Sequence, residues 1–142
     1  MFGADCVPLF FLDPVKKVIG TAHAGWRGTI NNIALNLIEK IKFEYQSDAK
    51  DLIVVIGPSI CSDCYEVGAD VYERFEANYE DAWNKTYEVS DSYKGNTILK
   101  PGKDDKGYLN LWLANHVNLV NAGVSNIGII TKEKYRSLMD HI

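Results

Sequence analysis

The apolar run Val7–Leu12 constrains the fold most, because it lies near the start of the chain and does not alternate with polar residues. Strands that are apolar on both sides are typical of sheets covered on both faces. The turn signal Asp13-Pro14 follows, and Val18–Ala22 is predicted to return antiparallel to the first strand. A doubly buried strand rarely starts a domain. We therefore expect residues 1–142 to form a single domain that is a fragment of a larger one.

Predicted strands alternate with amphipathic helices along the rest of the chain. Apolar residues recur at helical spacing from Ile30 to Ile41, with Gly28 or Thr29 as the expected N-cap. Leu52–Ile56 is rich in β-branched residues and is predicted to be a central strand that ends at Gly57. The remaining predicted elements are a helix from Glu66 to Tyr79, a weak helix at Ala82-Trp83, a strand at Thr97–Leu99, a helix from Leu109 closed by Gly123, and a strand at Ile127–Ile130. The predicted class is α+β, a layered α/β sandwich in which helices pack on a mixed sheet.

Charge and composition exclude several classes of partner. A net charge of −4 gives no basic stripe for nucleic acid or for an anionic membrane. No apolar run approaches the roughly 20 residues of a membrane span, and no signal-peptide pattern is present. Three cysteines are too few for a secreted disulfide scaffold, so we expect them to be thiols. The sequence indicates a cytoplasmic protein with small-molecule substrates, and it leaves the oligomeric state open.

The heptapeptide Ala22–Gly28 places an imidazole, an indole and a guanidinium at a predicted strand-to-helix junction. Such junctions expose backbone N–H groups and polar side chains to ligands. Arg27 at the start of the helix would add to the positive end of the helix dipole and favour phosphate or carboxylate. The alternative role for Arg27 is a surface salt bridge. We interpret Trp26 as a packing residue.

Cys6 and His23 lie at the far ends of the two predicted hairpin strands. A two-residue loop, Pro14-Val15, would place Cys6 directly opposite His23, with Cβ atoms ~4.5–5.5 Å apart. A three-residue loop would put them on opposite faces, and a four-residue loop would make them a diagonal pair on one face. A thiol beside an imidazole suits a nucleophile and its base, or two zinc ligands. The alternative is a small buried side chain beside a hydrogen-bonded histidine. Asp5 would orient a ligand or cap a turn.

Three other sites carry weaker signals. Cys61 and Cys64 have the spacing of a redox or zinc-binding pair, but no second pair accompanies them, and no helix follows directly. Tyr65-Glu66 lies at the start of the second predicted helix, where a carboxylate suits the helix dipole and serves as a cap. His116 is predicted to be a boundary residue in the middle of a helix.

Three segments together resemble the YfiH-type laccase-domain family. They are Ala4–Phe10, Ala22–Gly28 with the sequence AHAGWRG, and Ile56–Gly68 with GPSI and CYEVG. The resemblance extends to about residue 126, and residues 127–142 do not match. It implies a fold similar to that of the cysteine hydrolases of the cytotoxic necrotizing factor type.

The resemblance also implies a metal centre. Family members hold zinc, or in some cases copper, through one cysteine and two histidines; Cys6 and His23 match two of these ligands. The third family histidine lies upstream of the cysteine segment and is absent from this chain. Because zinc sites normally have at least three protein ligands, we expect this chain to bind metal weakly or not at all unless a partner chain or His141 supplies an imidazole.

The activity implied by the resemblance is that of a purine nucleoside enzyme. The family is credited with phosphorolysis of adenosine, inosine and methylthioadenosine and with adenosine deamination, and it was named for polyphenol oxidation. Cys6, His23 and Asp5 are then the expected catalytic residues. Contacts to substrate or phosphate are expected from Arg27, Gly25, Tyr65 and Glu66. The alternatives are a truncated or divergent member without catalytic competence and a thiol redox module formed by Cys61 and Cys64.

Overall fold

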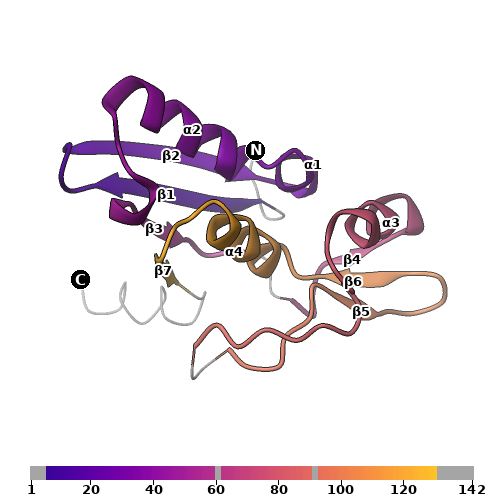
Figure 1. Cartoon of the computed structure of the whole chain (residues 1–142). Coiled ribbons are helices and arrows are strands. Elements are labelled where there is room, and N and C mark those ends of the chain that lie inside the picture. Colours follow the sequence, from indigo (N-terminus) through magenta and orange to yellow (C-terminus); the bar gives the residue numbers. More distant parts are fainter. Residues whose placement is uncertain (1–5, 60–61, 91–92, 131–142) are drawn as a thin grey trace, which may run out of the picture.

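Two β-sheets and four α-helices organise the part of the chain that the computed structural model describes, residues 6–59, 62–90 and 93–130 (Figure 1). The strands are β1 (Val7–Asp13), β2 (Val18–Ala24), β3 (Ile53–Ile56), β4 (Glu66–Val67), β5 (Leu99–Pro101), β6 (Gly107–Leu109) and β7 (Asn126–Ile129). The helices are α1 (Trp26–Ile30), α2 (Ile33–Tyr45), the 3-10 helix η1 (Ala49–Asp51), α3 (Ala69–Asn78) and α4 (Leu111–Asn121). No described helix is long and apolar enough to cross a membrane.

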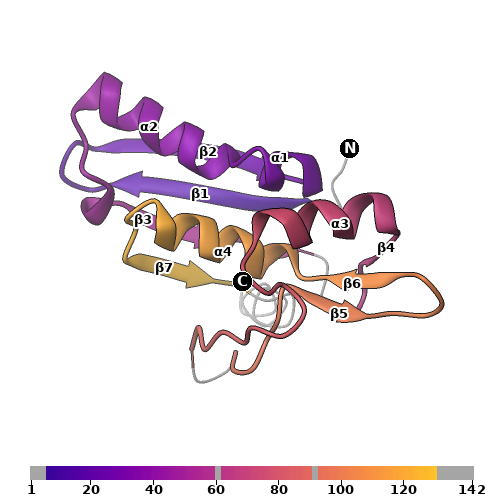
Figure 2. The ribbon, with the colours of Figure 1, turned by 45° about the vertical axis from the view of Figure 1, so that its right-hand side comes forward.

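The larger sheet is mixed, as predicted. Its strand order is β2-β1-β3-β7, with β1 antiparallel to both neighbours and β3 parallel to β7. Helix α2 runs alongside β2 in both views of the chain (Figures 1 and 2). Its Leu37 and Ile41 side chains lie 3.6 Å from the position that a Cβ on Gly20 would occupy. The smaller sheet, β4-β6-β5, is antiparallel, and α3 packs beside it.

The expectation that Val7–Leu12 is buried on both faces is wrong for the described chain. Val7, Leu9 and Phe11 are fully buried, whereas Phe10 is 46% and Leu12 is 40% exposed. Alternate residues of a strand point to opposite sides of a sheet, so the helices bury one face of β1 and the other face is open to solvent. We call the open side the outer face.

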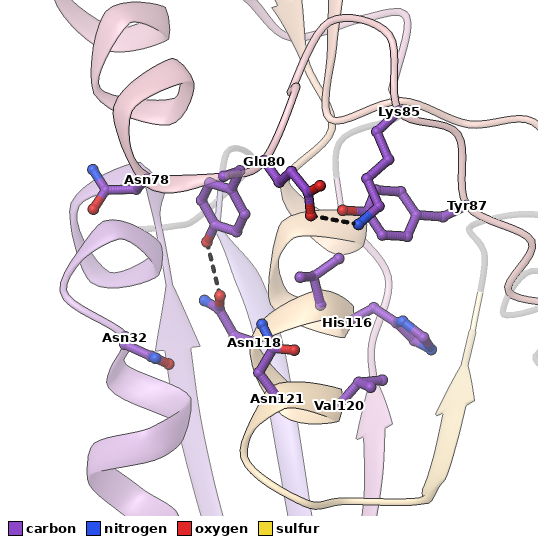
Figure 3. A pocket seen from close by; sticks show the side chains of 11 residues that line it. Asn32, Asn78, Glu80, Lys85, Tyr87, His116, Asn118, Val120 and Asn121 are labelled. Atoms are coloured by element: carbon purple, nitrogen blue, oxygen red, sulfur yellow. Dashed lines mark hydrogen bonds and ion pairs between the residues drawn. The ribbon is translucent and has the colours of Figure 1, made fainter.

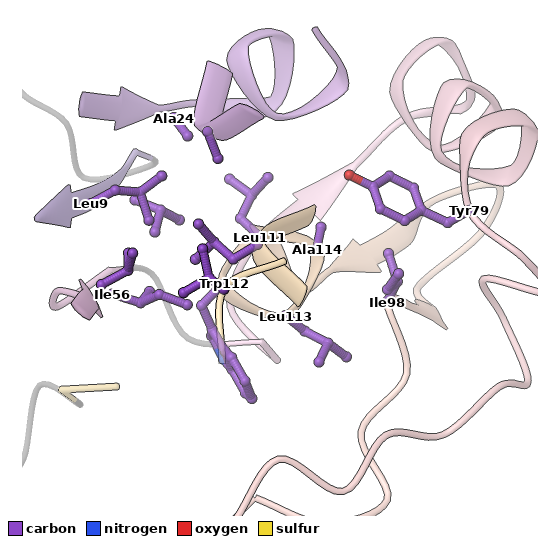
Figure 4. Close-up of a cluster of buried hydrophobic side chains, with 14 of the residues drawn as sticks. Leu9, Ala24, Ile56, Tyr79, Ile98, Leu111, Trp112, Leu113 and Ala114 are labelled. Carbon is purple, nitrogen blue, oxygen red and sulfur yellow. The ribbon is translucent and has the colours of Figure 1, made fainter. Parts of the chain in front are cut away.

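A single cluster of buried side chains joins the sheets and helices. Leu9 and Ile56 from the larger sheet meet Leu111 and Trp112 from α4 in this cluster (Figure 4). Ile98, just before β5, belongs to the same cluster. Helix α4 therefore lies at the centre of the fold, and its side chains connect the two sheets.

The first predicted helix forms as two helices. The N-caps are Gly25 for α1 and Asn32 for α2, so the expected cap at Gly28 or Thr29 is wrong. Asn32 adopts a left-handed conformation with φ of 55°, and its side chain accepts a hydrogen bond from Leu35 N at 3.3 Å. Asparagine tolerates this conformation better than most residues. The apolar spacing continues across the break, so periodicity alone does not reveal it.

The remaining elements follow the predictions with shifted boundaries. Helix α3 begins at Ala69 because Glu66 and Val67 pair with β6. The predicted weak helix at Ala82-Trp83 is a turn, and the strand predicted at Thr97–Leu99 is Leu99–Pro101. The fourth helix and the final strand are confirmed, and Gly123 follows α4 with φ of 98°.

Candidate active site

Cys6 and His23 share one side of the β1–β2 hairpin as a diagonal pair. In the observed register, Pro8 is opposite His23 and Val7 is opposite Ala24. Continuing this register places Cys6 opposite Gly25, and the Cys6 Sγ lies 3.6 Å from the position of a Cβ on Gly25. Direct pairing of Cys6 with His23 is therefore wrong. Diagonal neighbours are roughly 7–8 Å apart, within reach of long side chains.

The hairpin loop explains this register. Asp13 and Val18 are the last paired residues, so the four-residue loop is confirmed and the two-residue loop Pro14-Val15 is wrong. Asp13 Oδ1 accepts hydrogen bonds from Val15 N at 2.9 Å and from Lys16 N at 3.0 Å. Lys17 then turns the chain with φ of 58°. Proline cannot adopt the positive φ of the tight two-residue turns, and the longer loop avoids that conflict.

The chemistry of this pair fits two positions of a zinc site but does not complete one. Cys6 is a free cysteine and His23 is exposed on the outer face. Within residues 6–59, 62–90 and 93–130, no three histidine, cysteine, aspartate or glutamate side chains are grouped to hold a metal ion. Asp5 and His141 lie outside the described residues. Since a protein zinc site normally has three or four protein ligands, the described residues do not form one by themselves.

Arg27 lies in a small cationic cluster around Trp26. The Arg27 Cζ is 4.5 Å and the Arg74 Cζ is 5.6 Å from the centroid of the Trp26 ring. The three side chains line a surface pocket of about 270 Å³, together with Asp70. In the described part of the chain, neither guanidinium has an ion pair or a hydrogen bond. Two unneutralised cations on one indole favour an anionic ligand such as phosphate.

The helix dipole predicted to act at Arg27 is not present in the expected form. Arg27 is the second residue of α1 rather than the residue before a long helix, so a helix dipole does not act as predicted. Its cationic partner Arg74 comes from α3 and was missed. Asp70 lies four residues before Arg74, a spacing typical of a solvent-exposed helix pair, so the sequence carries no signal for Arg74.

Hydrogen bonds from α4 fix the position of α1. Thr29 is buried, and its hydroxyl donates to Gly25 O at 2.7 Å. Asn115 Nδ2 donates to Thr29 Oγ1 at 3.0 Å, and Asn118 Nδ2 donates to Thr29 O at 3.2 Å. The helix that carries Trp26 and Arg27 is therefore held by two buried amides that the sequence analysis missed.

Tyr65 and Glu66 lie at the start of the smaller sheet, away from Cys6 and His23. Glu66 is exposed in β4, opposite Tyr108, and its predicted role as a helix cap is wrong. Tyr65 O accepts a hydrogen bond from Leu109 N at 2.9 Å, which joins this segment to β6. Cys64 is disulfide-bonded, so the expectation of thiols is wrong for it. The number of cysteines does not determine the local geometry on which disulfide formation depends. Cys61 lies outside the described residues.

A larger pocket of about 450 Å³ lies between the end of α3 and α4 (Figure 3). At its rim, Lys85 Nζ donates to Glu80 Oε2 at 3.0 Å, and this contact raises the pKa of Lys85. His116 lines the pocket half-buried, as predicted for a boundary residue, and burial lowers its pKa. The lining contains none of the site residues predicted from the sequence.

The sequence of this chain is similar to a family model and to proteins with named enzymatic activities. A family model described as multi-copper polyphenol oxidoreductase laccase matches residues 1–137, so the expectation that residues 127–142 do not match the family is wrong for residues 127–137. A purine nucleoside phosphorylase of Rickettsia conorii is 36% identical over 132 residues, which are 93% of this chain and 49% of that protein. An adenosine deaminase from an unknown prokaryotic organism is 33% identical over 131 residues, covering 92% of this chain and 45% of that protein.

The fold of this chain is similar to that of a solved structure. The crystal structure of the hypothetical protein YfiH from Bacillus licheniformis matches with a TM-score of 0.70 at 30% identity. That match covers 90% of this chain and 44% of the YfiH chain. The chain thus spans about half the length, or less, of the proteins that it matches.

Proposed function

The chain belongs to the multi-copper polyphenol oxidoreductase laccase family, whose model matches residues 1–137, and in line with the names of its relatives we propose that it acts in purine nucleoside phosphorolysis. The names of the relatives support nucleoside processing at the level of the family. The observation that carries the choice of phosphorolysis is the pair of unneutralised guanidinium groups, Arg27 and Arg74, on the Trp26 ring. A reaction that consumes phosphate needs such an anion-binding site.

In the proposed reaction, a phosphate oxygen attacks C1′ of the ribose. The glycosidic bond breaks, its electron pair leaves with the purine, and a proton is transferred to the leaving base. The products are the free base and ribose 1-phosphate. Arg27 and Arg74 hold the phosphate through charge-assisted hydrogen bonds. Gly25, Tyr65 and Glu66 are the proposed contacts to the nucleoside.

Cys6, His23 and Asp5 are the proposed catalytic residues. In one arrangement Cys6 and His23 act as nucleophile and base: His23 takes the thiol proton, the Cys6 thiolate displaces the purine from C1′, and phosphate then displaces the thiolate to give the same products. In the other arrangement Cys6 and His23 are two ligands of a zinc ion, or of copper. The remaining ligand comes from outside the described residues. A bound zinc would supply an activated water for adenosine deamination. The finer features implied by the family also belong to this proposal: a cysteine-hydrolase type of fold, a cytoplasmic location, and polyphenol oxidation as an in vitro activity.

The experiment measures the products that the chain forms from adenosine with and without phosphate. We expect adenine and ribose 1-phosphate only when phosphate is present. Arg27→Gln and Arg74→Gln should each raise the KM for phosphate about tenfold or more, because each removes a charge-assisted hydrogen bond. Lys42→Gln, which removes a cation from the last turn of α2, is the matched control and should leave this KM unchanged.

Three outcomes would contradict the proposal. Turnover that is independent of phosphate and unaffected by Arg27→Gln would point to deamination without phosphorolysis. Absence of turnover with each of adenosine, inosine and methylthioadenosine would support a family member without catalytic competence. Loss of activity in Cys61→Ser but not in Cys6→Ser would instead favour a thiol redox module.

A further inference from the structure

We propose that the larger pocket, between the end of α3 and α4, binds a small neutral ligand with adjacent hydroxyl groups: a monosaccharide or the ribose of a nucleoside (Figure 3). We call it the polar pocket. Its volume of about 450 Å³ lies within the range of roughly 300–1,000 Å³ that is typical of small-molecule sites. Its lining contains none of the residues assigned to the proposed reaction, so this inference goes beyond the proposed function.

Side-chain amides form much of the wall of the polar pocket. Asn32 is the N-cap of α2, Asn78 is the last residue of α3, and Asn118 and Asn121 belong to α4. A carboxamide both donates and accepts hydrogen bonds, as a hydroxyl group does, so one amide can bond two neighbouring hydroxyls at once. Amides from three helices around one cavity are therefore complementary to a ligand with several hydroxyl groups.

Part of this hydrogen-bonding capacity is unused within the described part of the chain. There the Asn32 side chain uses only Oδ1 and the Asn78 side chain only Nδ2, in hydrogen bonds of 3.3 Å and 2.6 Å to the backbone. Asn121 and His116 make no side-chain hydrogen bond within residues 6–59, 62–90 and 93–130. Asn118 is already bonded at both amide atoms and holds the wall in place. Three amides and one imidazole are thus left for a ligand.

The charges of the polar pocket cancel, which selects a neutral ligand. Lys85 Nζ donates to Glu80 Oε2 at 3.0 Å, and these are the charged side chains among the described residues that line the pocket. Burial lowers the pKa of His116, so its imidazole is neutral near pH 7 and has one donor and one acceptor nitrogen. An anion would find no unpaired cation here, in contrast to the arginine cluster around Trp26.

An aromatic ring completes the wall. Figure 3 shows Tyr87 and His116 on one side of the polar pocket and Asn32 and Asn78 on the other. Tyr87 is half-buried, and Lys85 Nζ lies 5.4 Å from the centroid of its ring. A sugar ring has an apolar face of C–H groups that packs on an aromatic ring, while its hydroxyls extend sideways to polar groups. An aromatic ring opposite a row of amides suits such a ligand.

The test records the side-chain signals of the 142-residue chain by NMR during titration with D-ribose and with adenosine. A chelator is present and phosphate is absent, so that adenosine is not consumed. We expect saturable shifts of the Asn32, Asn78 and Asn121 amide signals with both ligands, because both contain the ribose ring. 2′,3′-Dideoxyadenosine keeps the base but lacks the two adjacent hydroxyls, and it should bind about tenfold more weakly than adenosine, or worse.

Variants of the wall test the location of the site. Asn121→Ala should weaken binding of both ligands about tenfold, because it removes an amide that has no other partner in the described chain. Asn36→Ala is the matched control, since Asn36 is also an exposed helical asparagine but lies outside the lining; its binding should be unchanged. Tyr87→Leu removes the aromatic face and should weaken both ligands severalfold.

The comparison of ligands identifies the source. Ribose binding as tight as adenosine binding would identify a free sugar as the ligand, and tighter binding of adenosine would identify a nucleoside. Both results support the proposal as long as the dideoxy compound binds weakly.

Three outcomes would overturn the proposal. The first is the absence of saturable shifts with both ligands. The second is equal binding of adenosine and 2′,3′-dideoxyadenosine, because the ligand would then be recognised through its base. The third is binding that Arg27→Gln abolishes and Asn121→Ala leaves unchanged, since the ligand would then lie at the proposed phosphate site. No turnover is measured, so failure of the proposed phosphorolysis is a separate result.

Discussion

The Tyr79 hydroxyl donates a buried hydrogen bond to Asn118 Oδ1 at 2.9 Å and so joins the end of α3 to α4. Burial raises the pKa of Tyr79 to about 12, so the hydroxyl keeps its proton near neutral pH. The Nδ2 atom of the same Asn118 amide donates to Thr29 O. One side chain thus holds α1 and α3, the two helices that contribute arginines to the Trp26 cluster.

Asn118→Ala should lower the free energy of unfolding by about 2–4 kcal/mol, because it leaves both the Tyr79 hydroxyl and the Thr29 carbonyl without this partner. Tyr79→Phe leaves only Asn118 Oδ1 without its partner and should cost about 1 kcal/mol. Urea denaturation measures both, and the double variant should cost less than the two single changes together. Equal effects of the two single variants would contradict this assignment.

Gly57→Ala should destabilise the chain by about 1–3 kcal/mol, since the new Cβ would lie 2.8 Å from Pro8 Cγ and 3.0 Å from Phe10 Cε2. Pro8 cannot rotate away because its ring is closed. Gly28→Ala is the opposite control: its Cβ would meet only ordinary contacts at 3.7 Å inside α1, where alanine stabilises a helix by about 0.5–1 kcal/mol. A lower melting temperature for Gly28→Ala than for Gly57→Ala, measured by thermal denaturation, would contradict the packing described for β1.

Asn32→Ala should cost about 1–2 kcal/mol, because it removes the N-cap of α2 and places alanine in a left-handed conformation. Asn32→Gly keeps the conformation without strain and should cost only a few tenths of a kcal/mol. The difference between the two variants, measured in guanidinium chloride, reports the backbone conformation at this break. Equal stability of the two would mean that the chain does not turn at Asn32.

Stability should fall as the pH drops below about 6.5, the ordinary pKa of histidine in the unfolded chain. Burial lowers the pKa of His116 in the folded state, so the unfolded state binds more protons in this range and is favoured by acid. The loss should level off below the folded pKa. In His116→Gln this dependence should be reduced, as measured by urea denaturation between pH 5 and 8; an unchanged profile would assign it to other groups.

Local patterns predicted most of the elements, because continuous apolar runs and helical spacing mark them directly. β1, β2 and β3 form where Val7–Leu12, Val18–Ala22 and Leu52–Ile56 predicted strands. Gly123 follows α4 as expected. The order of apolar and polar residues within one segment shows which of its side chains are buried, so these elements can be predicted without knowing their tertiary contacts.

Features that depend on contacts between segments could not be predicted. The sequence left three loop lengths open for the hairpin, and the choice of four residues follows from the Asp13 hydrogen bonds and the turn at Lys17, which an apolar pattern does not show. Glu66 pairs with Tyr108 instead of capping α3, because strand partners distant in sequence decide its conformation. Arg74 approaches Trp26 only through the packing of α3 against α1. The catalytic roles of Cys6 and His23 stay predictions.

The parallel pairing of β3 with β7 has a consequence for the order in which the chain folds. The three strands β1, β2 and β3 can pair as soon as the first half of the chain has been synthesised. Helix α4 and β7 follow much later in the sequence, so the Leu9 and Ile56 side chains stay exposed until α4 has been synthesised and buries them. Non-local contacts of this kind slow folding and leave apolar surface uncovered meanwhile. We expect the nascent first half to depend on molecular chaperones until α4 leaves the ribosome.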